Sequence, residues 1–456
     1  MAVDRHYDLV VIGGGAAGMS AARTGVERGG RVLLVQEGPI GGDCTFTGCV
    51  PSKTLLESAH VGLGFDAAMQ RVRDAVARVA ATEDDEVFEQ EGIEVRHAVA
   101  AFTSPTQVDL DGVRVTAKAF VVATGAAPRR PDIGLHRVRH HTTDDIWALQ
   151  TQPASLVIIG GGPVGCELAE AFAALGTNVT MVHSHDRLLA DHEPEASAVV
   201  QRSLATRGVD MVLGSRAASV REEGGRIFVV NESGASAAGD VLLVATGRTP
   251  TVDRLGLDRI SVEVTGRGIV TDKRLRTTVA GIHAAGDVTG RAPYTHAADE
   301  MGRIAASNAL GRLAWRRFDE RTIPSVTFTS PEVARIGMTE AAAAELDMGA
   351  RVAELPLDDV DRAIAADQTD GFVKLIAAPR PLTRNIAGGH LVGATIVAPR
   401  AGEMIHEVVV AMRAGMFTGR LAQAVHAYPT WSIAVRQAAA QFFTEVNGRT
   451  ARPARR

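Results

Sequence analysis

The chain has 456 residues, of which 46% are hydrophobic and 22% charged, so it is long enough for about three globular domains and lacks the composition of a disordered protein. Its 48 Lys and Arg against 53 Asp and Glu leave a formal net charge of -5, which gives no reason to expect a nucleic acid or an anionic membrane as partner. No uninterrupted apolar run approaches the ~20 residues that cross a bilayer, and three cysteines do not make a secreted disulfide scaffold. These features predict a cytoplasmic protein.

The chain begins with a strand–helix–strand pattern. Residues 7–12, "YDLVVI", are apolar and rich in β-branched side chains, "GGGAAG" opens a helical stretch, and "RVLLVQE" is a second strand. Gly13, Gly15 and Gly18 match the dinucleotide-binding fingerprint. In that fingerprint glycines allow a tight turn, close approach to a pyrophosphate and close helix packing, while the helix N-terminus faces the phosphates. One such match is weak evidence.

The same pattern recurs about 150 residues later in "SLVIIGGGPVGCELAEAFAALGTNVTMVHS", with Gly160, Gly162 and Gly165 in the fingerprint positions. Each copy is followed by an apolar strand that ends in Ala-Thr-Gly, at Thr124-Gly125 and at Thr246-Gly247. Two correctly framed fingerprints predict two bound dinucleotides.

The pattern changes from Ile323 onwards. The segments "IPSVTFTSPEVARIGMTE", "GFVKLIA" and "HLVGATIVA" predict strands, and helices follow as far as about Thr444. The predicted fold class is therefore α/β, with two doubly wound dinucleotide-binding domains and a C-terminal α+β domain. The arginine-rich end, "GRTARPARR", is predicted to be a solvated, frayed tail.

Two of the three cysteines, Cys44 and Cys49, lie close together in "GGDCTFTGCVPSK". A close pair in a reducing compartment indicates redox or metal chemistry. A metal site would need two more soft ligands, and the remaining cysteine, Cys166, lies inside the second glycine motif, where a small buried residue is expected. Redox chemistry is the favoured interpretation, and a buried inert pair is the alternative.

Together these motifs resemble the class I pyridine nucleotide-disulfide oxidoreductases, the family of glutathione reductase, dihydrolipoyl dehydrogenase and mercuric reductase. The most specific element is "GGDCTFTGCVPSK", which matches the redox signature of the family, and the likeness covers nearly the whole chain. The resemblance implies a homodimer that binds FAD and NAD(P)H and reduces a small-molecule acceptor. It also implies an FAD domain at 1–150 and again at 270–321, an NAD(P)H domain at 151–269 and a dimerisation domain at 322–456.

The resemblance implies roles for the redox signature. A helix that begins near Cys49, with Pro51 early in it, would place this thiol at the positive end of a helix dipole beside the flavin and lower its pKa. Hydride would pass from the nicotinamide to the flavin, the flavin would reduce the disulfide through Cys49, and Cys44 would attack the substrate. Lys53 is expected beside the flavin, in an ion pair with Glu167.

The resemblance also implies cofactor contacts outside the glycine fingerprints. Asp287 matches the aspartate that binds the FAD ribityl chain. The FAD ribose usually meets an acid where this chain has Gln36, so Glu37, the next residue, is the expected contact. The other expected contacts are Gly42, Asp43, Lys53, Thr124, Gly125 and Gly247.

The second nucleotide site departs from the NADH pattern. His183 stands where an NAD enzyme keeps an acid for the ribose hydroxyls. Its neighbours include Ser184, His185 and Arg187. An acid would repel a 2′-phosphate, whereas histidine and arginine would accept one. The sequence therefore favours NADPH, with NADH as the alternative if these residues are only an exposed turn.

The largest departure lies near the C-terminus. Disulfide reductases carry His-x-His-Pro-Thr-x-x-Glu there, whereas this chain reads "HAYPTWSI", with Tyr428 for the second histidine and Ile433 for the glutamate. A phenol with a pKa near 10 is a poor base at neutral pH, and losing a positioned base costs ~10²–10⁴ in rate. Reduction of ordinary disulfides should be weak unless His426 substitutes. Mercuric reductase shares the tyrosine, but "TARPARR" lacks the cysteine pair with which that enzyme hands over its metal, which argues against mercury detoxification.

The sequence therefore predicts an FAD-dependent NAD(P)H oxidoreductase that passes electrons through the Cys44–Cys49 pair. Its acceptor is an unusual disulfide, a thiol-bound metal or a small oxidant. Two alternatives stay open. In the first, the flavin reduces quinones or oxygen directly and the disulfide is only a relay. In the second, the protein is a non-enzymatic flavoprotein for assembly or redox sensing.

Overall fold

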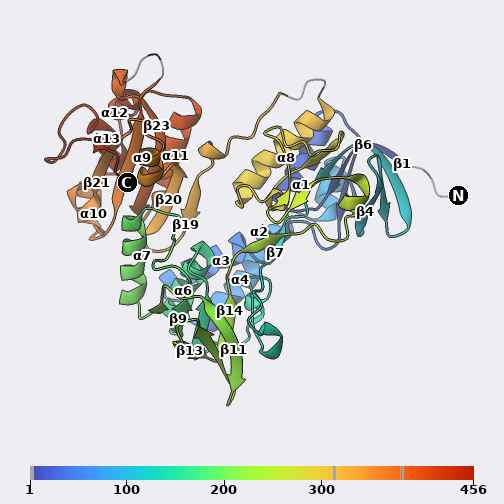
Figure 1. The fold of residues 1–456 in the computed structure, drawn as a ribbon, viewed down its shortest axis with the longest axis horizontal. Helices are drawn as coiled ribbons and strands as arrows, with labels where there is room; N and C mark the ends of the chain where they lie inside the picture. The colour runs from blue at the N-terminus through green and yellow to red at the C-terminus, as the bar shows by residue number, and fades with distance from the viewer. Residues whose placement is uncertain (1–4, 312–314, 381, 383–384, 456) are drawn as a thin grey trace. The chain divides into compact units, whose positions relative to one another are not determined.

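The computed structural model of the protein describes residues 5–311, 315–380, 382 and 385–455 (Figure 1). The chain divides into two compact units, and each is assembled from segments that are distant in sequence. The first unit comprises residues 1–131, 140–152 and 246–320, and the second comprises residues 132–139, 153–245 and 321–456. None of the helices in the described part of the chain combines the length and the apolar character that crossing a bilayer requires.

The first unit is built on a seven-stranded sheet with the order β3-β2-β1-β6-β5-β4, to which β18 adds through β6. Strands β3, β2, β1, β6 and β18 run parallel, and β5 and β4 are antiparallel. The side chains of Leu9, Val10 and Val11 in β1 are fully buried, as expected for a central parallel strand with both faces covered. The strands are β1 (Arg5–Ile12), β2 (Val32–Gln36), β3 (Glu94–His97), β4 (Ala100–Ser104), β5 (Gln107–Leu110), β6 (Val113–Val122) and β18 (Ile282–Ala284).

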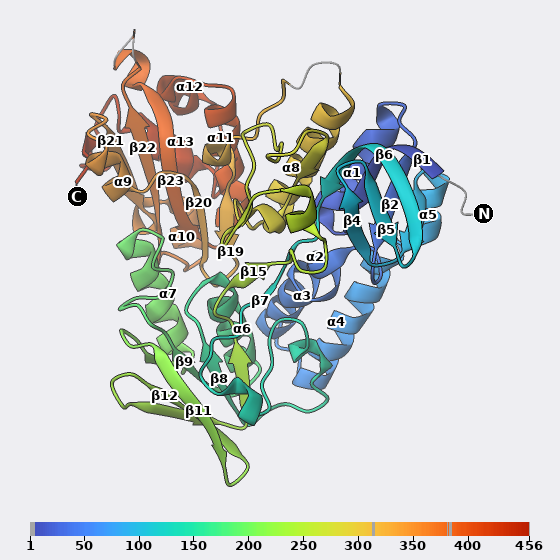
Figure 2. The same ribbon diagram turned by 45° about the vertical axis from the view of Figure 1, so that its right-hand side comes forward.

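Helices cover this sheet, and α1 (Ala16–Glu27) packs along α8 (Thr295–Leu310) (Figure 2). The redox signature forms the two helices α2 (Gly42–Phe46) and α3 (Cys49–His60). The other helices and short strands of the unit are α4 (Phe65–Ala80), α5 (Asp85–Gln90), β7 (Ala126–Pro128), β15 (Arg248–Pro250), β16 (Val264–Thr265) and β17 (Gly268–Ile269). Strands β7 and β15 pair antiparallel directly after the two Ala-Thr-Gly turns.

The N-terminal half of the second unit contains the second glycine motif. A parallel sheet with the order β10-β9-β8-β14 packs with α6, which in turn contacts α7, and a separate antiparallel sheet, β11-β12-β13, follows. The parallel elements are β8 (Ser155–Ile159), α6 (Pro163–Ala174), β9 (Asn178–Val182), α7 (Pro194–Thr206), β10 (Asp210–Val212) and β14 (Val241–Val244). The antiparallel strands are β11 (Ala217–Glu223), β12 (Arg226–Asn231) and β13 (Ser236–Gly239).

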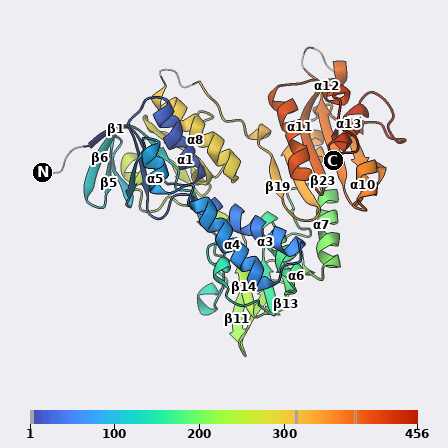
Figure 3. The same cartoon turned by 180° about the vertical axis from the view of Figure 1, so that it is seen from behind.

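The C-terminal half of the second unit is a six-stranded antiparallel sheet with the order β19-β20-β23-β22-β21-β24. Helices α11 and α13 bury one face of this sheet in a shared apolar core (Figure 3). The strands are β19 (Ser325–Thr327), β20 (Glu332–Gly337), β21 (Arg351–Pro356), β22 (Phe372–Ala378), β23 (His390–Ala398) and β24 (Arg452–Pro453). The helices are α9 (Glu340–Glu345), α10 (Asp361–Ala365), α11 (Ala401–Arg413), α12 (Thr418–Gln423) and α13 (Ile433–Ala440).

The predicted fold class is confirmed: the molecule is α/β with two glycine-rich nucleotide folds and a C-terminal α+β part. The division into domains at residues 150, 270 and 322 stays a prediction. The prediction of a frayed tail is wrong for Arg452 and Pro453, which form β24 and pair with β21. Arg452 also forms an ion pair with Glu340, so a cluster of acids elsewhere in the unit holds the end of the chain.

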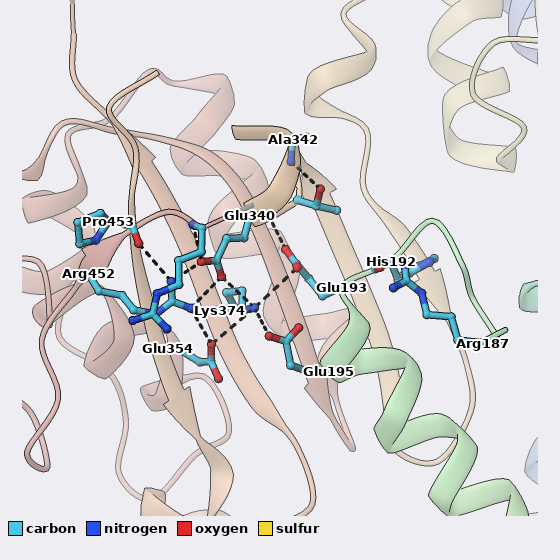
Figure 4. Close-up of polar contacts among 12 residues, drawn as sticks. Arg187, His192, Glu193, Glu195, Glu340, Ala342, Glu354, Lys374, Arg452 and Pro453 are labelled. Atoms are coloured by element: carbon cyan, nitrogen blue, oxygen red, sulfur yellow. Dashed lines mark hydrogen bonds and ion pairs between the residues drawn. The ribbon is translucent and has the colours of Figure 1, made fainter. Parts of the chain in front are cut away.

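Lys374 in β22 is fully buried and lies among four glutamates (Figure 4). We call these five residues the Lys374 cluster. Its Nζ–carboxylate distances are 3.7 Å to Glu193, 3.0 Å to Glu195, 3.2 Å to Glu340 and 3.6 Å to Glu354. Because Glu193 and Glu195 lie at the start of α7, the cluster joins the nucleotide fold of this unit to the six-stranded sheet.

The pKa values of the Lys374 cluster reflect this packing. Burial opposes the charge on Lys374, but the surrounding carboxylates raise its pKa above the usual value. Burial would raise the pKa of Glu340, yet hydrogen bonds from Arg452 and from the backbone of Arg455, with the Lys374 charge, lower it to about 2. Burial raises the pKa of Glu193, although the backbone N–H of Glu340 donates to its carboxylate.

Candidate active site

The first glycine loop lines a cavity at the carboxyl ends of β1 and β2. Gly13 has φ +109°, and a Cβ there would lie 2.2 Å from the carbonyl oxygen of Ala123, so only glycine fits. Helix α1 starts directly after Gly15, whose backbone caps it. The N–H of Gly14 donates to Oε1 of Gln36 at 2.7 Å, so the residue in the place of the usual acid holds the loop itself.

This cavity gathers most of the residues that the sequence predicted for the flavin site. Its lining includes Gly13, Gly15, Gln36, Glu37, Gly42, Asp43, Cys44, Cys49, Thr124, Gly125 and Asp287. Gly18 packs behind the loop, where a Cβ would collide with the carbonyl oxygen of Gly13. A glycine cradle at a helix N-terminus, which continues to two thiols, fits a long dinucleotide such as FAD. Glu37 forms an ion pair with Arg254 at 2.7 Å at the exposed end.

Arg248, directly after Gly247, is a residue that the sequence interpretation missed. Its guanidinium donates to the Asp43 carboxylate and to the carbonyl oxygen of Ala126, and its Nε lies 3.9 Å from Oδ2 of Asp287. Burial raises the pKa of Asp287, and the Arg248 charge opposes this shift. The buried Nε of Arg248 has no hydrogen-bond partner within the described residues, so it can donate a hydrogen bond to an anionic ligand. The signal was its place directly after the second Ala-Thr-Gly turn.

The redox pair lies at the junction of α2 and α3. Helix α3 begins at Cys49, with Gly48 as its cap, which confirms the predicted helix start. Both cysteines are half-buried thiols. A hydrogen bond with Cys49, then burial and the Cys49 charge, raise the pKa of Cys44. A raised pKa at Cys44 is compatible with the predicted roles, in which Cys49 at the start of a helix is the thiolate.

Side chains from distant segments hold the redox pair in place, and the sequence interpretation missed them. Thr295, the first residue of α8, places its hydroxyl 3.2 Å from Sγ of Cys49. The Thr45 hydroxyl donates to Oε2 of Glu83 at 2.7 Å. Nε1 of Trp147 donates to the carbonyl oxygen of Thr47 at 3.1 Å. A single threonine, glutamate or tryptophan carries no motif, so no local signal marked these contacts.

The second glycine loop repeats the design of the first. A Cβ on Gly160 would lie 2.2 Å from the carbonyl oxygen of Ala245, Gly162 caps α6, and Gly165 packs against Gly160. The N–H of Gly161 donates to Nδ1 of His183 at 3.1 Å, just as Gly14 donates to Gln36.

His183 accepts this hydrogen bond as a neutral ring. Burial, and then the nearby His185, lower its pKa. Because Nδ1 accepts, the ring hydrogen is on Nε2, which is buried and has no partner in the described part of the chain. Arg187 donates to the carbonyl oxygen of Ala190 at 2.6 Å, whereas Ser184 and His185 are exposed.

The predicted Lys53–Glu167 pair stays a prediction. Lys53 lies in α3 of the first unit and Glu167 in α6 of the second. Oε1 of Glu167 accepts a hydrogen bond from the N–H of Phe328 at 3.0 Å. Cys166, beside it, is fully buried, as the sequence predicted, and burial raises its pKa, which disfavours the reactive thiolate.

The C-terminal segment holds both of its candidate side chains in local contacts. The Tyr428 hydroxyl donates to Oδ2 of Asp361 at 2.7 Å, and this carboxylate raises the phenol pKa. Nδ1 of His426 lies 3.0 Å from the carbonyl oxygen of Ala424, and Nε2 lies 2.7 Å from Oε2 of Glu407. Both ring nitrogens of His426 therefore have an oxygen within hydrogen-bond distance. Glu407 is an acidic partner that the sequence interpretation missed.

Comparison with known proteins identifies the family. Residues 7–302 match the family described as pyridine nucleotide-disulphide oxidoreductase, and residues 323–439 match its dimerisation domain. A mercuric reductase from Staphylococcus aureus is 33% identical over 97% of this chain and 84% of its own length. A dihydrolipoyl dehydrogenase from Chlamydia muridarum is 30% identical over 94% of this chain and 95% of its own length.

A solved structure supports the same assignment. The Cu(II) complex of the HOCl-induced flavoprotein disulfide reductase RclA from Escherichia coli has a TM-score of 0.87 and 28% identity to this chain, and the match covers 96% of this chain and 99% of that one. Members of the family bind FAD and use NAD(P)H. The chain therefore belongs to the class I pyridine nucleotide-disulfide oxidoreductases and is an FAD-dependent enzyme with a cysteine pair at Cys44 and Cys49.

Proposed function

We propose that the enzyme delivers the electrons of NAD(P)H to a thiophilic metal ion bound by the Cys44–Cys49 pair. FAD, when bound, supplies the two-electron link between the nicotinamide and the cysteines. This chain binds the metal: Cys49 contributes a thiolate and Cys44 a second one after losing its proton. NAD(P)H becomes NAD(P)⁺ with release of one proton, and its two electrons reduce one Hg(II) to Hg(0) or two Cu(II) to Cu(I).

The observation that carries this proposal is the state of the C-terminal segment. An ordinary disulfide leaves a thiolate that must be protonated, and this step needs a positioned acid. Tyr428 is bound to Asp361, and both ring nitrogens of His426 have acceptors within the same segment and α11. A metal held by two thiolates requires no such proton. A mercuric reductase and a Cu(II)-bound flavoprotein among the similar proteins support the same acceptor class.

An acceptor comparison with purified holoprotein tests the proposal. We expect Hg(II) or Cu(II), presented with excess small thiol, to support NADPH oxidation. The rate of NADPH oxidation with glutathione disulfide or lipoamide should be lower by a factor of about 10² or more. The Cys44→Ser variant should lose metal turnover while any direct quinone reduction by the flavin survives. Efficient turnover of lipoamide or glutathione disulfide by the unaltered enzyme would contradict the proposal.

Restoring the family's acid–base pair sharpens this test. The double change Tyr428→His with Ile433→Glu should raise disulfide activity about tenfold or more, whereas neither change alone should suffice, because an imidazole without its orienting carboxylate adopts the wrong tautomer or rotamer. Metal turnover should gain little. Equal gains with both acceptors would show that the missing pair does not determine the choice of acceptor.

A second candidate function is reduction of a disulfide with His426 as the acid. The 2.7 Å contact between Nε2 of His426 and Oε2 of Glu407 is the observation that favours it, because this is the histidine–carboxylate pairing of an acid–base dyad. In that case His426→Gln would abolish disulfide turnover and leave metal turnover unchanged. If both activities are unchanged, His426 has a packing role.

We infer a homodimer from the dimerisation domain, and we expect a preference for NADPH that depends on Ser184 and His185. His183 and Arg187 already contact the loops of this site, so these two exposed residues are left to meet a 2′-phosphate. A charge-assisted phosphate contact contributes ~1.5–3 kcal/mol, or about tenfold or more in kcat/KM. Equal kcat/KM values for NADPH and NADH would contradict the inferred preference for NADPH.

A further inference from the structure

The segment 183–193, which we call the nucleotide loop, connects β9 to α7 and is tied to the second glycine loop. The N–H of Leu189 donates to the carbonyl oxygen of Gly161 at 2.8 Å, and the N–H of Gly161 donates to Nδ1 of His183 at 3.1 Å. Leu189 has φ +49°, a left-handed backbone conformation that residues with side chains rarely adopt. Strain of this kind persists only where the surrounding structure holds it, so further contacts must fix the arrangement of the loop.

One contact inside the nucleotide loop joins its middle to its C-terminal end. The Arg187 guanidinium donates through Nη2 to the carbonyl oxygen of Ala190 at 2.6 Å and to that of His192 at 3.4 Å. Figure 4 shows Arg187 beside His192. A group that holds the C-terminal end of the loop therefore also restrains Arg187, which follows the proposed nucleotide contacts Ser184 and His185 in sequence.

One face of the six-stranded sheet carries a row of polar side chains across its four central strands. The register pairs these residues in turn, and we call them the polar row: Arg335, Thr395, Lys374 and Glu354. The residues on both sides of each in sequence belong to the apolar core that contains α11 and α13. Because successive side chains of a strand point to opposite faces, the polar row lies on the face of the sheet away from this core.

The polar row holds the chain where it leaves the nucleotide loop. Nη1 of Arg335 donates to the carbonyl oxygen of Asp191. The fully buried Nζ of Lys374 lies 3.7 Å from the carboxylate of Glu193 and 3.0 Å from that of Glu195. Three alternate residues, 191, 193 and 195, are thus bound to one face of the sheet, so the sheet fixes the C-terminal end of the nucleotide loop.

We propose that the polar row positions the nucleotide loop for NAD(P)H, with Arg335 and Lys374 as positioning residues that act through the loop. The proposal rests on the nicotinamide nucleotide site that we infer at residues 183–187, and it does not depend on the electron acceptor. A loop that has lost these contacts spends only part of its time in the binding-competent arrangement, and the apparent affinity falls by that fraction. Hydride transfer after binding is unchanged, because the bound nucleotide selects the same arrangement.

The test measures nucleotide binding and flavin reduction in the purified holoenzyme. Arg335→Met removes the donor to Asp191 and keeps an unbranched side chain. Its Kd for NADP⁺, measured by calorimetry, should rise about three- to tenfold, because the competent fraction falls to about a third to a tenth. In anaerobic stopped-flow mixing, the NADPH concentration that half-saturates flavin reduction should rise by the same factor, whereas the limiting rate should stay the same. Arg335→Lys should recover part of the affinity, because an ammonium group also donates hydrogen bonds.

Lys374→Met should raise the Kd for NADP⁺ in the same direction as Arg335→Met. If Lys374→Met does not give folded holoenzyme, Arg335→Met alone decides. A Kd for Arg335→Met equal to that of the natural enzyme overturns the proposal, and so does a lower limiting rate at an unchanged half-saturating concentration.

Arg202→Gln is the matched control. It breaks the ion pair between Arg202 in α7 and Asp370 at 2.8 Å, which also joins the nucleotide fold to the C-terminal half of the unit, but both side chains are more than half exposed. Its Kd for NADP⁺ should equal that of the natural enzyme, and a rise as large as that of Arg335→Met would overturn the proposal.

The same titrations with NAD⁺ separate this proposal from the inferred preference for NADPH. Equal Kd values for NADP⁺ and NAD⁺ in the natural enzyme would contradict that preference. The ratio of the Kd of Arg335→Met to that of the natural enzyme, with either nucleotide, would still decide whether the polar row positions the loop. Because neither measurement needs an acceptor, the result also stands if metal turnover fails.

Discussion

The redox loop, residues 41–49 of the first unit, and the Lys374 cluster of the second unit both concentrate ionisable groups, but they treat charge in different ways. In the cluster, the carboxylates surround a lysine that is fully buried, and Arg452 adds a second cation. At the redox loop, Glu83 accepts a hydrogen bond from Thr45 and forms no ion pair with another described residue, and the two thiols of the loop are only half-buried. Matched charges hold elements of the second unit together, whereas the thiols of the redox loop are left partly open to solvent.

The largest effect is expected at the redox loop, from removing either sulfur. Cys49→Ser and Cys44→Ser should each lower turnover with the thiol-dependent acceptor by about a thousandfold or more, because no other described residue supplies the second sulfur. The two variants should differ in colour. Cys44→Ser should show the long-wavelength thiolate–flavin band without reductant, and Cys49→Ser should lack it after reduction.

Absorbance spectra of the two serine variants across pH check these roles. If the Cys44→Ser protein lacks the band at every pH, the assignment of Cys49 as the flavin-side sulfur is wrong. The redox loop would then lack the thiolate that distinguishes it from the Lys374 cluster.

At the cluster, Lys374→Met should destabilise the protein by about 3–5 kcal/mol, because it leaves buried carboxylates without their central cation. The matched control is Lys118→Met, which breaks the ion pair of Lys118 with Asp8 at 2.6 Å, where the lysine side chain is 66% exposed. An exposed pair is worth about 0–1 kcal/mol. Urea unfolding of both holoproteins measures the difference, and equal losses would show that burial does not determine the role of this lysine.

Lowering the pH should reduce the loss of unfolding free energy that Lys374→Met causes. The pKa of Glu340 is lowered to about 2 from 4.5, so its contribution to stability is complete above about pH 4.5 and is lost as pH falls towards 2. Glu193 acts in the opposite sense, because its raised pKa favours the protonated folded form and this contribution is lost as pH rises. In the variant the carboxylates repel one another until they are protonated.

The difference in unfolding free energy between natural protein and variant should therefore shrink between about pH 5 and pH 3. The groups that decide it are Glu193, Glu195, Glu340, Glu354 and Arg452. Unfolding at about pH 7, 5 and 3.5 measures the trend. If the difference in unfolding free energy stays constant with pH, the variant is destabilised by lost packing of the lysine side chain and not by repulsion between carboxylates.

The smallest effect is expected from Thr295→Val, which removes the hydroxyl 3.2 Å from Sγ of Cys49 and keeps the shape of the side chain. Losing one hydrogen bond to a charged group costs about 1.5–3 kcal/mol at most, and a solvated thiolate recovers part of it. The reduced enzyme should show a weaker long-wavelength band and a few-fold lower turnover. An unchanged band would mean that the hydroxyl does not bind the Cys49 thiolate.

The sequence alone determined the parts of the molecule that depend on local backbone geometry. The two glycine fingerprints marked their loops because positions such as Gly13 and Gly160 have no room for a Cβ and a positive φ. The start of α3 near Cys49, with Pro51 early in the helix, was expected from the redox signature. The family signature then identified the cysteine pair, and the alternating pattern after Ile323 indicated the strands β19 and β20.

Only the tertiary structure decided which charges meet. Glu193 in α7, Glu340 in α9 and Glu354 in β21 converge on Lys374, and Arg452 leaves the expected tail to join them. Glu83 reaches Thr45, and Glu407 reaches His426, by the same kind of long-range contact. A single acidic or hydroxyl residue looks alike in any exposed segment, because its role depends on burial and on a partner that only the folded chain supplies.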